Sequence, residues 1–322
     1  RGNAPPPMPS TDLPDQLAPV PEERLAWQPD LHEPNTTVHA TVDRLDMPGI
    51  TFMDDHGRTA ARKFFNEVRT ADMFVAVVRA FDNPSVPAYR NTVDPARDLE
   101  ELKTEMLLAD LELVTTRIER LEKSVHKPTK TQAREKAELE LQLKLQDAIE
   151  SEKPISSVIE NDLQMDLIKP LNFLTLKPIM VVVNIGEDQL ETKIELGAGV
   201  DENTEVVQVC ASLESELAQL DEADRAEFMA DMGLAEPASK KFVQSCYSTL
   251  GLISFLTVGK DEVRAWPIEK GTSALDAAGK IHSDIKRGFI RAETMSYTDL
   301  QEFGDEKAVK AAGKARLEGK AY

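Results

Sequence analysis

The sequence predicts an α/β protein with a mostly parallel sheet, an inserted α-helical coiled-coil arm and a small C-terminal α+β domain. Three observations predict this fold. Short apolar runs rich in β-branched residues alternate with helical stretches, which is typical of parallel strands joined by crossover helices. A long run with heptad spacing separates two of these strands. Finally, the charge balance changes after residue 259, which indicates a separate domain.

The candidate strands of the sheet are short, and their apolar residues indicate that they are buried. They cover residues 37–46, 73–80, 178–185 and 205–211. Before them, residues 1–36 contain nine prolines. Proline lacks a backbone N–H and fixes φ, so this density predicts an extended loop or arm rather than a helix or a ladder strand.

The insertion between the second and third strands covers residues 93–170. Asp94 followed by Pro95 is typical of a helix start. Apolar residues then repeat at spacings of four and three, at Leu107, Leu111, Val114, Ile118, Leu121 and Val125. After a break at 126–128, the pattern predicts a second helix over 133–152. The two helices form an antiparallel hairpin, whose leucines either pack the hairpin alone or support an arm that acts as a lever or contact surface.

The C-terminal segment differs from the rest in charge. Residues 260–322 hold 12 basic and 11 acidic side chains, whereas the whole chain holds 38 and 57, for a net charge of −19. Candidate strands at 252–258, 263–268 and 289–296 surround a helix at 273–282. The last segment places Lys307, Lys310 and Lys314 on one helical face, which is either a solvated face or a surface that contacts phosphate.

Composition excludes several classes of protein. The acidic balance argues against a general nucleic-acid coat but leaves room for a local basic patch. Two cysteines, Cys210 and Cys246, make neither a disulfide framework nor a zinc module, which fits a reducing compartment. The longest aliphatic run, 179–183, is far shorter than the roughly 18 residues that span a bilayer. We therefore expect neither a membrane nor DNA as partner.

Two motifs suggest a nucleotide-operated switch. Asp46 and Gly49 form a D-x-x-G just after a candidate strand, where an aspartate can support a magnesium shell and a glycine amide can meet a phosphate. Asn184 and Glu187 form an N-x-x-E at the carboxyl end of another strand, where α/β proteins read a base edge. Aspartate usually occupies the last position when the base is guanine, and glutamate departs from that pattern.

Long segments of the chain resemble the Obg-like ATPases, also called the YchF family. They are VDPARDLEELKTEMLLADLELVTTRIERLEK (93–123), residues 219–237, EVRAWPIEKGTSALDAAGKIHSDIKRGFIRAE (262–293) and AGKARLEGKAY at the end. The resemblance runs through almost the whole chain. It implies a P-loop NTPase-type domain in two parts (1–92 and 171–258), a coiled-coil arm (93–170) and a C-terminal TGS domain (259–322).

The resemblance also implies functional residues. Asn184 and Glu187 would read the base, and Ala211, Ser212 and Leu213 would form the loop behind it. Asp46 and Gly49 would form the phosphate-sensing turn, followed by the hydrophobic Ile50 where other NTPases carry a catalytic glutamine. The ligand would be ATP with Mg²⁺ in preference to GTP. The partner would be the ribosome, through its rRNA and proteins, with Lys307, Lys310 and Lys314 and the arm as contacts.

The sequence departs from the family at the phosphate side. No G-x-x-x-x-G-K-[ST] occurs, although that loop cradles the phosphates, and we expect it upstream of Arg1. Residues 51–63 replace a glycine-rich switch with one glycine and two acids. We therefore interpret the nucleotide site as degenerate and expect weak or absent hydrolysis.

Two alternatives remain, an ATP-operated ribosome factor and a pseudo-NTPase that serves as a scaffold in a ribosomal or assembly particle. A cytoplasmic location fits the composition, and a mitochondrial one would need a targeting segment before Arg1.

Overall fold

The protein is described by a computed structural model that places residues 16–25, 35–259 and 261–322. The described chain forms two compact units. The first covers Met47–Gly233, and the second joins the described residues 16–25 and 35–46 with Leu234–Tyr322. The four-part domain division expected from the sequence cuts the chain elsewhere and stays a prediction.

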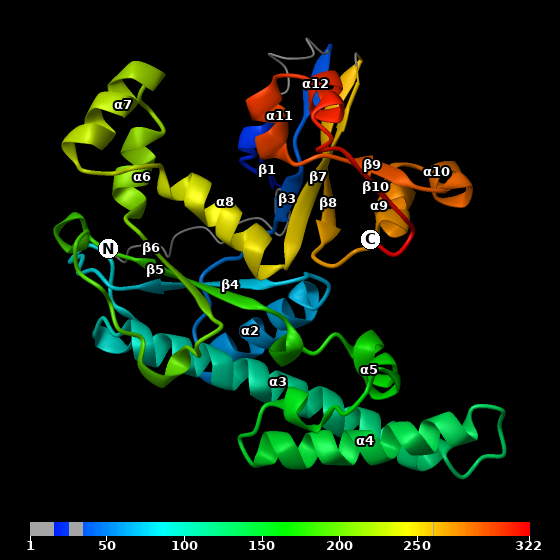
Figure 1. The fold of residues 1–322 in the computed structure, drawn as a ribbon. Coiled ribbons are helices and arrows are strands. Elements are labelled where there is room, and N and C mark those ends of the chain that lie inside the picture. The colour runs from blue at the N-terminus through cyan, green and yellow to red at the C-terminus, as the bar shows by residue number, and fades with distance from the viewer. Residues whose placement is uncertain (1–15, 26–34, 260) are drawn as a thin grey trace. The chain divides into compact units, whose positions relative to one another are not determined.

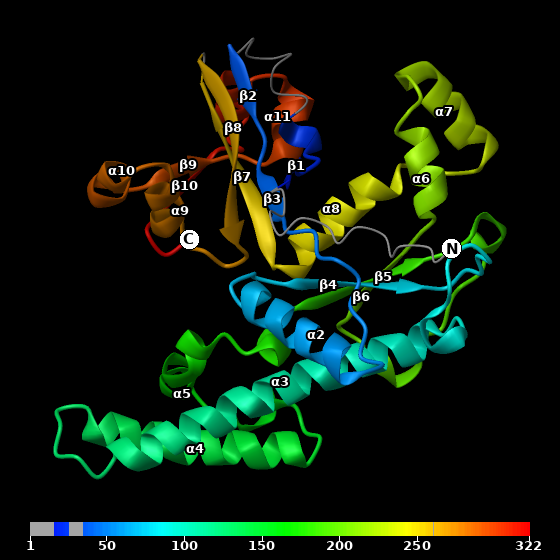
Figure 2. The same cartoon turned by 180° about the vertical axis from the view of Figure 1, so that it is seen from behind.

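The first unit is built on a parallel sheet of three strands in the order β4-β5-β6 (Figure 1). These strands are β4 (Phe74–Arg79), β5 (Ile179–Asn184) and β6 (Glu205–Val209). The register aligns Val77 with Val182 and Val182 with Val207. Three of the four predicted strands are thus confirmed, as is their parallel pairing. Helices α2 (Asp55–Val68) and α3 (Pro95–Ser124) cover one face of this sheet (Figures 1 and 2).

The predicted arm is a helical hairpin of α3 and α4 (Gln132–Glu150). Helix α3 begins at Pro95 as predicted, with the Asp94 side chain accepting from the Arg97 N–H. The heptad pattern is confirmed as the buried seam, since Val114, Leu141 and Leu145 are at most 2% exposed. Helix α5 (Asp162–Ile168) and short 3-10 turns at Ile155–Val158, Lys169–Leu171 and Leu174–Leu176 lead back to the sheet. The unit ends with α6 (Ala211–Leu217) and α7 (Glu222–Asp231).

The second unit contains a mixed sheet in the order β2-β8-β7. Strands β7 (Leu252–Val258) and β8 (Glu262–Glu269) pair antiparallel, and β2 (Thr36–Val38) adds to β8 in parallel. A separate ladder joins β1 (Gln16–Pro19) to β3 (Thr41–Arg44). The prediction that residues 37–46 belong to the parallel sheet is therefore wrong, because their backbone pairs with β8 and β1 instead. The prediction that the proline-rich segment forms no ladder strand is also wrong at β1, where Pro19 is tolerated because it stands at the strand end. Residues 1–15 and 26–34 of that segment lie outside the described residues.

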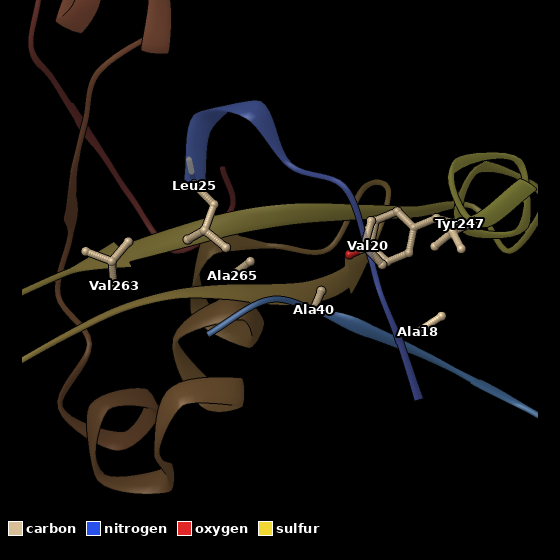
Figure 3. Packing of buried hydrophobic residues seen from close by; sticks show 8 residues of the cluster. Ala18, Val20, Leu25, Ala40, Tyr247, Val263 and Ala265 are labelled. Atoms are coloured by element: carbon tan, nitrogen blue, oxygen red, sulfur yellow. The ribbon is translucent and has the colours of Figure 1, made fainter. Parts of the chain in front are cut away.

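The core of the second unit lies between this sheet, α8 (Ala238–Thr249) and the N-terminal segment. Figure 3 shows Val20, Leu25 and Ala40 gathered against Val263 and Tyr247. The Tyr247 hydroxyl lies 2.7 Å from the Ser254 Oγ, so its polar tip is satisfied within the core. The segment before Asp46 is thus part of the C-terminal unit by packing as well as by pairing.

The C-terminal end follows the predicted α+β order. It consists of α9 (Ala274–Ile281), α10 (Ser283–Gly288), β9 (Ala292–Thr294), α11 (Tyr297–Phe303), α12 (Glu306–Ala311) and β10 (Arg316–Glu318). The strand predicted over 289–296 is shorter than expected and pairs with β10. No helix in the described residues is long and apolar enough to cross a bilayer.

One buried carboxylate ties the first unit together. Asp110 on α3 is fully buried and accepts hydrogen bonds from Arg69 Nη1 at 2.7 Å, the Leu174 N–H at 3.1 Å and the Thr175 N–H at 2.9 Å. Arg69 lies just after α2, and its Nη2 also donates to the Ala109 carbonyl at 3.0 Å. Asp110 therefore links α2, α3 and the segment that enters β5.

We expect Asp110→Asn to lower the free energy of unfolding by about 3 kcal/mol, because it leaves the Arg69 guanidinium without its charge partner and turns an amide group toward N–H donors. Urea unfolding measures this. Glu112→Gln on the same helix is the control, since its contact with Arg62 is exposed and 3.8 Å long, and it should cost less than about 1 kcal/mol. Equal effects of the two changes would contradict the role given to Asp110.

Candidate functional site

The predicted base-reading residues lie at the carboxyl ends of β5 and β6. Asn184 is the last residue of β5, and Glu187 begins the 3-10 turn Glu187–Gln189 that follows it. The Ile185 N–H donates to the Val209 carbonyl at 2.9 Å, which holds the two strand ends side by side. Helix α6 begins at Ala211, immediately after β6. The sheet thus brings the N-x-x-E loop and the start of α6 to one edge.

Two hydrogen bonds join these segments. The Ala211 N–H donates to Asn184 Oδ1 at 3.2 Å, and the Ser212 hydroxyl donates to Glu187 Oε1 at 3.2 Å. Asn184 is half-buried, whereas Glu187, Ala211 and Ser212 are exposed. The amide group of Asn184 keeps its two N–H donors, and the Glu187 carboxylate keeps further acceptor sites. The edge therefore presents donors and an acceptor together to solvent.

The third residue of the predicted loop plays a different part. Leu213 is 4% exposed, so its side chain packs in the core and only its backbone faces the site. The Cys210 thiol is also buried and lies 3.2 Å from the Ser212 Oγ. These two side chains anchor the start of α6 beneath Ala211 and Ser212.

One residue that positions the loop was not predicted from the sequence. Gln189 accepts from the Gly186 N–H through Oε1 at 2.8 Å and donates through Nε2 to the Ala80 carbonyl at 2.9 Å. It thereby ties the turn that carries Glu187 to the end of β4. A glutamine three residues after a glycine in the turn that follows a strand is a weak sequence signal, because the partner Ala80 is distant in the chain.

The predicted phosphate-sensing turn is divided between the units. Asp46 ends the stretch that belongs to the second unit and is exposed. Gly49, in the first unit, is exposed and has open space where a Cβ would stand. Ile50 packs against the cluster of Phe52, Phe65 and neighbouring apolar residues under the sheet. Ile50 is thus held by the core of the first unit.

The segment that replaces the glycine-rich switch is a capped helix. Asp54 is the N-cap of α2, and its Oδ1 accepts from the Gly57 N–H at 2.7 Å. Asp55 adds a second carboxylate to the first turn. N-terminal helix amides and their dipole are the groups that usually bind an anion. Here Asp54 already occupies one of these amides with a carboxylate of the chain itself.

The predicted lysine face is wrong at one position, because α12 ends at Ala311 and Lys314 lies beyond the helix. Two of the three lysines are paired within their own domain. Lys310 Nζ lies 2.6 Å from Glu293 Oε2, and this carboxylate raises the pKa of the Lys310 ammonium above its usual value. Lys314 Nζ lies 3.7 Å from Asp299 Oδ1. Lys307 is exposed and, among the described residues, forms no ion pair. In the described part of the chain, no cluster of His, Cys, Asp and Glu side chains is arranged to hold a metal ion.

Comparisons with known proteins agree with this architecture. The family model YchF-GTPase_C, described as "Protein of unknown function (DUF933)", matches residues 252–322. The chain is 40% identical over 312 residues to "Ribosome-binding ATPase YchF" of Bacillus subtilis (strain 168), covering 94% of this chain and 84% of that protein. The chain belongs to the YchF/Obg-like ATPase family.

Further relatives and a solved structure place the chain in the same family. "Obg-like ATPase 1" of Oryza sativa subsp. indica is 34% identical over 310 residues, covering 94% of this chain and 78% of that protein. The "Structure of the Schizosaccharomyces pombe YchF GTPase" superposes with a TM-score of 0.81 at 29% identity, covering 96% of this chain and 84% of that one. The chain carries a C-terminal TGS-like domain, and the match to the family model begins at the first residue of β7.

We expect Gln189→Ala to lower the free energy of unfolding by about 1–3 kcal/mol, because the Gly186 N–H and the Ala80 carbonyl lose their partner in a half-buried turn. Hydrogen exchange at the Gly186 amide should accelerate in parallel. Gln219→Ala is the matched control, since the Gln219 side chain makes one exposed hydrogen bond to the Ser215 carbonyl. An unchanged exchange rate at Gly186 would refute the positioning role.

Proposed function

We propose that this YchF-family chain is a ribosome-associated nucleotide-binding factor with weakened or lost ATP hydrolysis. The cluster of Asn184, Glu187, Ala211 and Ser212 at the carboxyl ends of β5 and β6 carries the proposal. The catalytically silent pseudo-NTPase, a scaffold in a ribosomal or assembly particle, is the second candidate. The capped start of α2 favours it.

The exposed edge of the sheet fits an adenine base. Adenine presents an amino group that donates and ring nitrogens that accept. The Glu187 carboxylate can accept from the amino group while it still accepts from Ser212, and the Asn184 amide can donate to a ring nitrogen while its oxygen accepts from Ala211. Gln189 keeps the Glu187 turn in place for this contact.

The phosphate side fits a nucleotide less well. ATP with Mg²⁺, when bound, supplies the phosphoanhydride bond that an ATPase cleaves. Asp46 and the Gly49 amide are the residues of this chain proposed to meet the metal shell and the terminal phosphate. Asp54 and Asp55 oppose that role, because they place negative charge and a competing cap at the start of α2. This opposition supports the proposal of weakened hydrolysis.

The ribosome is the proposed partner, through rRNA and ribosomal proteins. The relative from B. subtilis and others, such as the protein from Haemophilus influenzae at 36% identity over 310 residues, are named ribosome-binding ATPases. The proposed contacts on this chain are the α3–α4 arm and the face of Lys307, Lys310 and Lys314. A cytoplasmic location is proposed with it, and a mitochondrial one is the alternative.

Calorimetry with ATP and Mg²⁺ tests the proposal directly. The chain described here and the product of its whole reading frame should be titrated side by side, followed by a phosphate-release assay. The nucleotide-binding factor predicts heat of binding in at least one of the two proteins, with turnover far below that of the B. subtilis relative measured in parallel. If neither protein gives heat of binding or releases phosphate, the scaffold is the better candidate. A rate of phosphate release equal to that of the B. subtilis relative would contradict weakened hydrolysis.

We expect Glu187→Asp to shift the base preference from ATP toward GTP. The shorter side chain moves the carboxylate away from Ser212, and aspartate is the residue that usually accepts from guanine at this position. Fluorescent ATP and GTP analogues, titrated into the product of the whole reading frame, give the ratio of the two affinities. Glu191→Asp, an exposed residue just beyond the turn, is the control. An unchanged ratio in Glu187→Asp would remove Glu187 from base recognition.

A further inference from the structure

The end of the arm is basic although the chain as a whole is acidic. Residues 120–136, the end of α3, the connecting loop and the start of α4, contain six basic and two acidic side chains, against a net charge of −19 for the chain. The six cations are Arg120, Lys123, Lys127, Lys130, Arg134 and Lys136, named here the tip cations. All six are exposed.

The tip cations are not neutralised by the arm. Among the described residues, none of the six forms an ion pair within 4.0 Å, although Glu119 lies four positions before Lys123 on α3. Elsewhere on the arm the pairs are made, as between Arg117 and Glu138. By contrast, Lys310 on α12 and Lys314 just after this helix both form ion pairs with carboxylates. The tip therefore keeps its positive charge for a partner.

The tip is held firmly by the hairpin beneath it. Arg117 and Glu138 form two parallel hydrogen bonds between α3 and α4, at 2.6 and 2.9 Å. Above them, Leu121 and Val125 are buried, and Gln132 Nε2 donates to the Val125 carbonyl at 2.8 Å. These contacts hold the loop against the ends of the two helices, so the backbone that carries the tip cations is fixed before a partner binds.

The hairpin also carries the tip away from the sheet. Helix α3 has 30 residues, so it extends over roughly 45 Å. The α3–α4 loop lies at the end of the hairpin remote from β4, β5 and β6 in both views (Figures 1 and 2). A partner at the tip is therefore reached without contact with the strands β4, β5 and β6.

The chemistry of the tip favours phosphate over a protein partner. Residues 119–137 expose no large hydrophobic side chain, whereas protein interfaces depend on buried apolar or aromatic anchors. The exposed surface offers instead lysine, arginine, His126 and the hydroxyls of Thr129 and Thr131. These are the side chains that most often contact a nucleic-acid backbone.

We propose that the tip of the α3–α4 arm binds the phosphate backbone of an RNA helix through the tip cations. This inference rests on the proposed ribosome association and names the part of the ribosome that the arm meets. Contacts to phosphate carry no base readout, so the tip binds RNA helices with little sequence preference and with strong dependence on salt.

Titration of a short fluorescent RNA hairpin into the full chain, by anisotropy over a range of salt concentrations, tests the proposal. The tip variant is Lys123→Glu, Lys127→Glu and Lys130→Glu together. The matched control reverses Lys153, Lys169 and Lys193, three exposed lysines of the same unit outside the tip, so both proteins change net charge equally. A second tip variant, with glutamine at the same three positions, removes the positive charges without adding negative ones that could disturb the helix ends. Circular dichroism verifies that each variant is folded.

The tip variant should bind the hairpin at least tenfold more weakly, with a salt slope smaller by about three, one for each lost phosphate contact. The control variant should stay close to the unchanged protein. Equal losses in both variants, or none in the tip variants, would overturn the proposal. So would a tip variant that no longer co-sediments with ribosomes but binds the hairpin normally, because the tip would then meet a ribosomal protein. ATP calorimetry is independent of this outcome, so failure of nucleotide binding is distinguished from failure at the tip.

Discussion

The buried Asp110 carboxylate is the contact on which the first unit depends. It joins the end of α2, the middle of α3 and the chain that enters β5, through Arg69, Leu174 and Thr175. Because β5 ends at Asn184 and α3 continues into the arm, one ion pair fixes both the proposed base-reading edge and the root of the hairpin. A buried charge of this kind is tolerated only when every acceptor position is used, as it is here.

Local patterns in the sequence were sufficient to predict most of the first unit. The apolar runs around Val77, Val182 and Val207 predict the strands, and the heptad spacing predicts the hairpin, because each depends on a residue's near neighbours. The approach of Asn184 and Glu187 to Ala211 and Ser212 was expected only from the resemblance to the family, and the parallel strands β5 and β6, which end at one edge, account for it. Four of the predicted site residues thus lie together, while their role in base recognition stays a prediction.

Contacts between distant parts of the chain could not be predicted in this way. The pairing of β2 with β8 joins segments 225 positions apart, as at Thr36 and Asp261, and nothing in the pattern of 37–46 distinguishes it from a strand of the parallel sheet. The same holds for Gln189, whose partner Ala80 lies just after β4, and for Lys310, whose partner Glu293 is 17 positions away in the sequence. Side-chain partners of this kind depend on the fold itself.

The start of α2 shows how stability and phosphate binding compete for the same groups. A helix N-terminus leaves backbone N–H groups without partners, and either a side-chain cap or a bound anion satisfies them. Asp54 supplies the cap here, through the Gly57 N–H, and stabilises α2 beneath the sheet. A typical cap contributes about 1 kcal/mol, and a phosphate that displaced Asp54 would have to offset this loss and the repulsion of Asp55. The segment thus stabilises the fold at the expense of the proposed phosphate site, whereas the proposed base-reading edge, built from β5, β6 and α6, does not include the start of α2.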